Sequence, residues 1–160
     1  SLTCAQEWLQ VEPCIVSYSD IFYEATAVRS LCSCDAKLAL TYDPNWIMLW
    51  SRRFRNPLDD AETFRLSPDG YLADIGNSPA TLSEVQGQYM GLLRFTPAGW
   101  LEVIKVRQSL APAQCDTMHM TGTLREVINR GRIAPLPISY TGIWGEVDAK
   151  SDVEVYNQQS

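Results

Sequence analysis

The chain has 160 residues, of which 46% are hydrophobic, and this length suits one compact domain over residues 1–160. Its formal net charge of -6, from 13 basic and 19 acidic residues, argues against a broad basic surface for nucleic acid or an anionic membrane. No stretch is apolar for long enough to predict a transmembrane helix, and the first ten residues resemble no signal peptide, so we expect a cytoplasmic protein. Five cysteines without framework spacing predict free thiols.

The first half of the chain predicts helices that alternate with short strands. Apolar residues at helical spacing predict an amphipathic helix over 2–9, and an apolar β-branched run predicts a strand over 14–18. A helix over 24–31 and a strand over 37–42 repeat this order, and residues 46–57 are expected to be partly helical. The alternation indicates an α/β fold.

A hairpin and a central strand follow. The proline and glycine of 67–70 favour a tight turn between antiparallel strands at 62–66 and 71–75. Residues 88–95 read as a central strand, in which Gly91 suits a close backbone approach.

The last third predicts three helices and two short strands. Pro97 opens one helix, and a second begins near Thr121, where Thr123 and Glu126 fit a capping box and Gly131 suits the end of the helix. The prolines in the strand 133–138 indicate an edge position, residues 143–147 lead into Asp148, and a last helix covers 151–156.

These elements predict a three-layer α/β fold with a mainly parallel mixed sheet, in which Asp20 and Asp148 each follow an apolar strand. Ligands of open α/β sheets bind beyond the carboxyl ends of the strands, so the two carboxylates are expected to converge on one crevice. Two hard oxygen ligands suit Mg²⁺. From the spacing alone, a turn former or a helix cap is the favoured interpretation, because these are common roles of aspartate after a strand.

Three sequence strings resemble a known family. They are SYSDIFYE at 17–24, VQGQYMGL at 85–92 and WGEVD at 144–148. Together with their surroundings they resemble the later part of the nucleotidyltransferases allied to phosphocholine cytidylyltransferase and to the transferase domains linked to phosphonopyruvate-processing enzymes. The resemblance covers nearly the whole chain in order, and it implies a truncated, Rossmann-like nucleotidyltransferase fold.

The resemblance also implies a reaction and a site. The family transfers a cytidylyl group from CTP to a small phosphorylated or phosphonate acceptor, with Mg²⁺ as the cofactor. By this resemblance, Asp20 and Asp148 are the catalytic metal ligands. The residues that it places near the acceptor are Gln86, Gln88, Tyr89, Trp144 and Glu146. For the large aromatic residues Trp46, Trp50 and Trp100, packing in a core or subunit interface is the favoured interpretation.

Family members begin with a strand and a glycine-rich loop that wraps the triphosphate, and no such loop precedes Asp20. None of the nine glycines comes before Gly70. The chain alone is therefore expected to bind triphosphate weakly. Loss of that amino-terminal segment would leave a sheet edge bare, and a bare edge predicts homo-oligomerisation. Two alternatives to a cytidylyltransferase stay open, namely a non-catalytic remnant that serves as a binding or assembly module, and a glycosyltransferase of related architecture.

Overall fold

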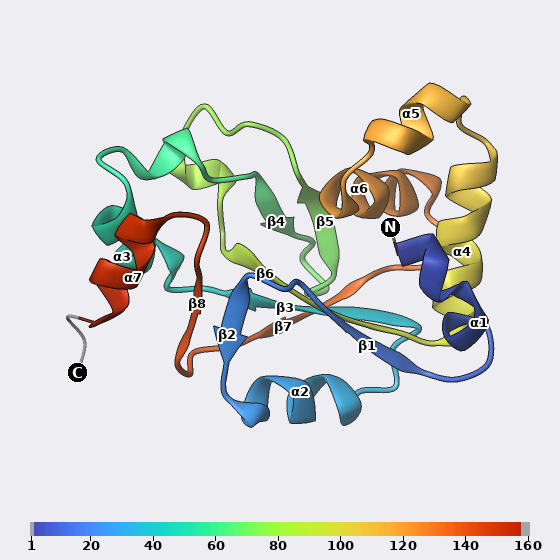
Figure 1. Cartoon of the computed structure of the whole chain (residues 1–160). Helices are drawn as coiled ribbons and strands as arrows, with labels where there is room; N and C mark the ends of the chain where they lie inside the picture. The colour runs from blue at the N-terminus through green and yellow to red at the C-terminus, as the bar shows by residue number, and fades with distance from the viewer. Residues whose placement is uncertain (1, 158–160) are drawn as a thin grey trace.

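Four strands form the central sheet in the computed structural model, which describes residues 2–157 and leaves Ser1 and 158–160 of the expected domain outside (Figure 1). The strand order is β1-β6-β3-β7. Pairs β1–β6 and β3–β6 are antiparallel, whereas β3–β7 is parallel. The bounds of the strands are Cys14–Ser17 for β1, Leu38–Asp43 for β3, Gln88–Phe95 for β6 and Leu136–Ser139 for β7.

The sheet is mixed, as expected, but most of its pairing is antiparallel. Strands β1, β3 and β7 run in one direction, and the long strand β6 runs the other way between β1 and β3. The expectation of a mainly parallel sheet is therefore correct for the direction of three strands and wrong for their hydrogen-bonded pairs. Alternation of helices and strands along the sequence cannot reveal a strand that returns between two others.

Each face of the sheet packs against its own core. Leu38, Leu40 and Leu93 face a core that includes residues of α4 and α6, whereas Ala39 and Leu92 face a second core with α2 and α3. This alternation follows from the two-residue period of a strand, and it creates the predicted layers on both sides of the sheet. Figure 1 shows α2 on one side of the sheet and α6 with the β4–β5 pair on the other.

The helices agree closely with the sequence pattern. After a 3₁₀ turn at Leu2–Ala5, they are α1 (Gln6–Leu9), α2 (Ala25–Cys32), α3 (Trp46–Arg53), α4 (Pro97–Gln108), α5 (Pro112–Thr117), α6 (Met120–Arg130) and α7 (Lys150–Asn157). Short 3₁₀ turns also cover Pro57–Asp59 and Leu82–Glu84. Helix α5 has no counterpart in the predicted elements.

The predicted capping box of α6 is wrong. His119 occupies the N-cap position, and Thr123 lies inside the helix, where its hydroxyl donates to the His119 carbonyl over 3.1 Å. The predicted end is correct, because Gly131 adopts a left-handed conformation with φ of 62°. The start of α6 matters because His119 and Thr121 line a pocket.

Two small antiparallel sheets complete the fold. One is the predicted hairpin of β4 (Phe64–Leu66) and β5 (Leu72–Ile75). The other pairs β2 (Ile21–Tyr23) with β8 (Trp144–Glu146), which joins two segments more than a hundred residues apart. Asp20 and Asp148, the two aspartates singled out by the sequence, flank this second pair.

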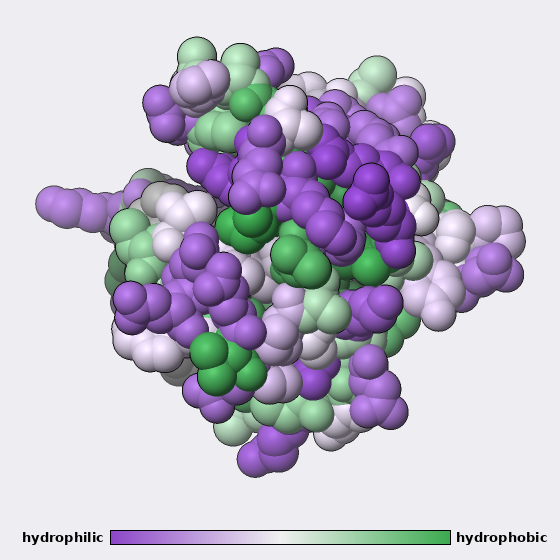
Figure 2. All heavy atoms as spheres, turned by 90° about the vertical axis from the view of Figure 1, so that its right-hand side faces the viewer, coloured by the Kyte–Doolittle hydropathy of each residue, from purple (hydrophilic) through white to green (hydrophobic). Residues whose placement is uncertain are grey.

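The remaining expectations concern exposure. Trp46, Trp50 and Trp100 are buried, with exposed fractions of 4%, 0% and 1%, and all five cysteines are free. On the side formed by α1, α4 and α5, hydrophilic side chains predominate and hydrophobic ones are scattered between them (Figure 2). A membrane-spanning helix is absent from residues 2–157, whose longest helix, α4, has 12 residues.

Candidate functional site

Asp20 and Asp148 lie at the same end of the β2–β8 pair. Asp20 directly precedes β2, and its carbonyl accepts a hydrogen bond from the Val147 backbone N–H over 2.8 Å. The pairing of Ile21 with Glu146 fixes this register. Because the strands are antiparallel, the start of β2 adjoins the end of β8, and the backbones of the two aspartates are brought close together.

A cavity of about 530 Å³ opens beside this strand pair, within the volume range of small-molecule sites. Asp148 lines it, while Asp20 is outside its lining at the adjoining backbone. Four of the seven site residues expected from the resemblance line this cavity, namely Gln88, Tyr89, Glu146 and Asp148. The lining also includes residues that sequence reasoning missed: Tyr18, Asp60, Glu62, Gly91, His119 and Thr121.

The structure places Gln86 and Trp144 elsewhere. The Gln86 side-chain oxygen accepts a hydrogen bond from the Leu66 backbone N–H over 2.6 Å. The Trp144 ring is buried, and its indole N–H donates to the buried Asp43 carboxylate over 3.0 Å. The Gln86 side chain therefore connects the segment before β6 to β4, and the Trp144 side chain connects β8 to β3.

Strand β6 contains a bulge beside the cavity. The register against β3 shifts between Leu40 and Tyr42, which pair with Leu93 and Tyr89, and Gly91 within the bulge has a φ of 78°. A Cβ atom at Gly91 would lie 2.8 Å from the Tyr18 ring, so this close approach requires glycine, as the sequence suggested. The bulge therefore lets β6 and the Tyr18 ring approach each other closely at the cavity.

Two polar atoms in the cavity lining lack a hydrogen-bond partner of acceptable geometry in the part of the chain that the structure describes. The Gln88 Oε1 atom and the Tyr89 hydroxyl are buried, and neither has a hydrogen bond of acceptable geometry among residues 2–157. The Tyr18 ring packs edge-on against that of Tyr89, with centroids 5.9 Å apart. Buried polar groups are normally paired, so these two atoms are suited to a bound ligand or to water.

Arg53 is the main functional residue that sequence reasoning overlooked. Its guanidinium is fully buried at the end of α3 and forms ion pairs with three carboxylates. The distances are 3.2 Å to Glu146, 2.8 Å to Asp148 and 3.1 Å to Asp152. Burial opposes the charged form of Arg53, but the hydrogen bonds to the carboxylates outweigh it and raise its pKa. Arg53 therefore remains a cation behind the metal-ligand candidates.

Asp152, on α7, joins this cluster to the backbone. One of its oxygens accepts the N–H groups of Asp148 and Ala149, each over 2.9 Å. Burial works against its ionised form, but the hydrogen bonds from Arg53 and from the two backbone N–H groups prevail and lower the pKa of Asp152. The segment that follows β8 is thus held from both its backbone and its side chains.

The cavity is acidic, and burial affects its carboxyl groups strongly. Burial raises the pKa of Glu62 above its ordinary value, although the Thr121 hydroxyl donates to Glu62 over 3.1 Å and acts in the opposite direction. Burial also raises the pKa values of Asp60 and Glu146, and the charge of Asp148 adds to both shifts. Crowded carboxylates of this kind are typical of sites that bind cations.

We expect Glu62→Gln to raise the midpoint of thermal unfolding at pH 7 and to leave it nearly unchanged near pH 4. Because the folded-state pKa of Glu62 is raised, the folded protein binds more protons than the unfolded chain just above the ordinary pKa of 4.5. The free energy of unfolding therefore falls as the pH rises from 4.5 through the raised pKa of Glu62, and it remains lower at higher pH. Glutamine does not ionise, so the variant does not lose this stability. Thermal unfolding at the two pH values tests this. The exposed Glu7→Gln is the control, and a lower midpoint for Glu62→Gln at pH 7 would contradict the prediction.

The carboxylates present fit a Mg²⁺ site that uses few protein ligands. Half of the Asp148 side chain is exposed, and its Oδ2 atom is the one that contacts Arg53. No group of three or more histidine, cysteine, aspartate or glutamate side chains within residues 2–157 is arranged to enclose a metal ion. Mg²⁺ in nucleotide sites usually keeps several waters and binds through one or two carboxylates and the substrate phosphates. Asp148 at the cavity fits that mode, and Asp20 adjoins it through the backbone.

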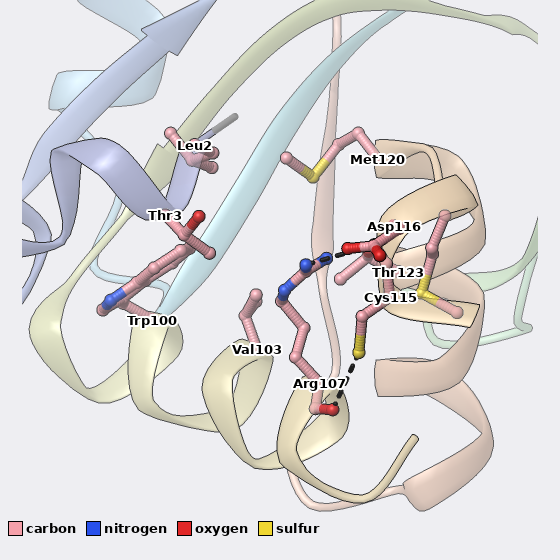
Figure 3. A pocket seen from close by; sticks show the side chains of 10 residues that line it. Leu2, Thr3, Trp100, Val103, Arg107, Cys115, Asp116, Met120 and Thr123 are labelled. Atoms are coloured by element: carbon pink, nitrogen blue, oxygen red, sulfur yellow. Dashed lines mark hydrogen bonds between the residues drawn. The ribbon is translucent and has the colours of Figure 1, made fainter. Parts of the chain in front are cut away.

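A second cavity, of about 200 Å³, lies between the amino-terminal 3₁₀ turn and helices α4 to α6 (Figure 3). Its lining includes Trp100, Met118 and Met120. Arg107 donates to the Cys115 carbonyl and the Cys115 thiol donates to the Arg107 carbonyl, each over 3.1 Å. None of the site residues expected from the resemblance lines this cavity, whereas four of the seven line the acidic cavity, which is therefore the candidate site.

The chain resembles a curated protein in sequence. A CTP:phosphoglutamine cytidylyltransferase from Campylobacter jejuni is 32% identical over 163 residues, which cover 95% of this chain and 64% of that protein. The chain thus spans less than two thirds of this relative. No family model matches the chain.

Solved structures show the same fold at low sequence identity. A protein from Bacillus anthracis described as a glucose-1-phosphate thymidylyltransferase has a TM-score of 0.72 and 10% identity, over 99% of this chain and 58% of that one. An inositol-1-phosphate CTP transferase from T. maritima has a TM-score of 0.70 and 13% identity, over 96% of this chain and 57% of that one. The resemblance of this chain to the nucleotidyltransferase family is therefore confirmed, by sequence and by fold, along nearly its whole length.

Proposed function

We propose that this chain carries the metal-binding and acceptor-binding part of a cytidylyltransferase, which transfers the cytidylyl group of CTP to a small phosphorylated acceptor. The supporting observation is the acidic cavity beside the β2–β8 pair, where Asp148 and the adjoining Asp20 lie at one end of two paired strands. The name of the Campylobacter jejuni relative supports CTP as the donor.

The reaction needs alignment and charge neutralisation more than proton transfer. An anionic phosphate oxygen of the acceptor attacks the α-phosphorus of CTP, the bond to the β-phosphate oxygen breaks, and pyrophosphate leaves with the electron pair. Asp20 and Asp148 would hold Mg²⁺, which when bound supplies positive charge to the phosphates. Gln88 and Tyr89 would orient the acceptor through their unpaired polar atoms.

The charge of the cavity favours an acceptor that carries a positive group. Asp60, Glu62, Glu146 and Asp148 line the cavity, and its described lining contains no lysine or arginine. A cationic group near the carboxylates is attracted, whereas a second anionic group is repelled. Aminoalkyl phosphates and aminoalkyl phosphonates meet both conditions, and phosphorylated amino acids supply the cationic group together with a carboxylate.

A transfer assay tests the proposal. The purified chain is incubated with CTP, Mg²⁺ and phosphocholine, aminoethylphosphonate or phosphorylated glutamine, and pyrophosphate and the CDP-linked product are measured. With CTP in large excess, which offsets the weak triphosphate binding expected of this chain, we expect product with a cationic acceptor and less with glucose 1-phosphate, which has no positive group. Calorimetric binding of an acceptor without turnover would favour the alternative of a non-catalytic binding module, and neither binding nor turnover would contradict the proposal.

Self-association is a further part of the proposal. Within residues 2–157, strand β1 pairs with β6 alone, so one edge of the sheet is available to another chain. A second copy is the simplest cover for such an edge. Sedimentation velocity at micromolar concentration tests this expectation, and a monomer there would contradict it.

A further inference from the structure

Arg53 connects α3 to the segment that carries Asp148, and it uses three nitrogen atoms to do so. Its Nε and Nη2 atoms donate to the two oxygens of Asp152, over 3.1 and 3.3 Å. Its Nη1 atom donates to Glu146 over 3.2 Å, and Nη2 also donates to Oδ2 of Asp148 over 2.8 Å. A side chain from one helix therefore holds three carboxylates that lie 93 to 99 residues further along the chain.

We propose that Arg53 is a positioning residue of the divalent-cation site, which holds Asp148 by one carboxylate oxygen and leaves the other oxygen for the metal ion. This inference rests on the proposed function, because it takes Asp148 as a metal ligand. The positioning acts through Asp148, and Arg53 itself lies behind the cavity, outside its lining.

Contacts other than the one to the Asp148 side chain also fix the position of Arg53. The bidentate pair with Asp152 sets the plane of the guanidinium, and Asp152 is itself anchored by the backbone N–H groups of Asp148 and Ala149. The guanidinium also lies over the Trp50 ring, 5.0 Å from its centroid. A donor held this firmly restricts the rotation of the Asp148 carboxylate.

The charge of the cluster agrees with a cation site. One guanidinium faces three carboxylates, so two negative charges remain when all three acids are ionised. Part of that charge is located at the half-exposed Asp148, which is the member of the cluster most open to the cavity. Arg53 thus reduces the repulsion among the acids and leaves enough negative charge to attract a divalent ion.

The geometry predicts which ions the site prefers. A carboxylate with one oxygen engaged by Arg53 is restricted to monodentate coordination. Mg²⁺ and Mn²⁺ suit compact octahedral shells, whereas Ca²⁺ accepts bidentate carboxylates and larger, more variable shells. Releasing the Oδ2 atom of Asp148 from Arg53 should therefore weaken the binding of Mn²⁺ more than the binding of Ca²⁺.

The test compares Mn²⁺ and Ca²⁺ binding, by calorimetry, in the unmodified chain, Arg53→Lys and Arg52→Lys. Lysine keeps the charge of Arg53 but lacks its planar fork. We expect Arg53→Lys to lower Mn²⁺ affinity by at least about tenfold, the range typical for supporting residues of metal ligands, and to lower Ca²⁺ affinity less. Arg52 is the matched control, because its guanidinium contacts the Val155 carbonyl and no carboxylate within residues 2–157.

A second variant keeps the test independent of folding defects. Asp152→Asn retains an oxygen for the backbone N–H groups and removes the charge that anchors Arg53, so the same shift toward Ca²⁺ is expected. Equal weakening of both ions, or Mn²⁺ binding unchanged in Arg53→Lys, would overturn the inference and leave the proposed function standing. An unmodified chain that binds neither ion would overturn the proposed metal site itself.

Discussion

Replacing Asp148 with asparagine is expected to lower Mn²⁺ affinity and metal-dependent transfer by at least about 100-fold, the upper end of what the loss of a supporting outer-shell partner costs. Asparagine has nearly the same shape as aspartate. It keeps an oxygen that can accept the hydrogen bond from Arg53, which is 2.8 Å long in the unmodified protein. The change removes the negative charge that a hard divalent ion needs. The fold should therefore persist while the site fails.

Two measurements check this prediction. Calorimetry with Mn²⁺ reports the site directly, and pyrophosphate release from CTP reports transfer. Asp69→Asn is the control, because Asp69 is an exposed residue of the turn between β4 and β5 and should affect neither quantity. Equal Mn²⁺ affinity in Asp148→Asn and the unmodified chain would show that Asp148 is no metal ligand.

Local patterns predicted most of the individual elements, because their causes are local. Pro97 at the first turn of α4 and Gly131 at the end of α6 act through their own backbone preferences, so the sequence alone locates them. The turn before Gly70, whose φ is 81°, belongs to the same class. The start of α6 near Thr121 is correct to within one residue, but the capping box is wrong because Thr123 and Glu126 satisfy the capping pattern inside the helix, where neither defines its start.

The features that organise the site depend on long-range contacts, and no local pattern reports them. The run around Arg53 predicts a partly helical segment, but nothing near it indicates partners such as Glu146 and Asp152. A Gln-Gly-Gln segment suggests two equivalent side chains. The structure directs Gln86 to the β4 backbone and Gln88 to the cavity. That difference arises because Gln86 precedes β6 and its backbone pairs with β4, whereas Gln88 begins β6 and pairs with β3.

The two aspartates were found by a different kind of inference. Asp20 and Asp148 follow apolar runs, and strand ends are common sites of ligand binding, but the spacing alone favours turn formers. The family resemblance favoured the metal site. The structure adds a physical reason for their proximity, because β2 and β8 form an antiparallel pair that brings together the segments containing the two aspartates. This pairing was not among the predicted elements.

Trp50→Ala is expected to reduce the free energy of unfolding by about 3–5 kcal/mol, the usual cost of truncating a large buried aromatic side chain. Trp50 is fully buried, and its ring packs near Trp46, Phe54 and Trp144, with centroids 6.0 to 6.3 Å apart. Domains are typically stable by about 5–15 kcal/mol, so a loss of this size consumes a large share of the total. Urea denaturation at 25 °C measures it.

Trp8→Ala separates burial from residue type, because 66% of the Trp8 side chain is exposed on α1. Its expected effect on the free energy of unfolding is within about 0.5 kcal/mol, and similar losses in the two variants would contradict the packing argument. The Trp50 ring also supports Arg53, because the Arg53 guanidinium lies over this ring, 5.0 Å from its centroid. A cavity there allows Arg53 to move, so Trp50→Ala should also weaken Mn²⁺ binding under conditions in which it stays folded, whereas Trp8→Ala should not.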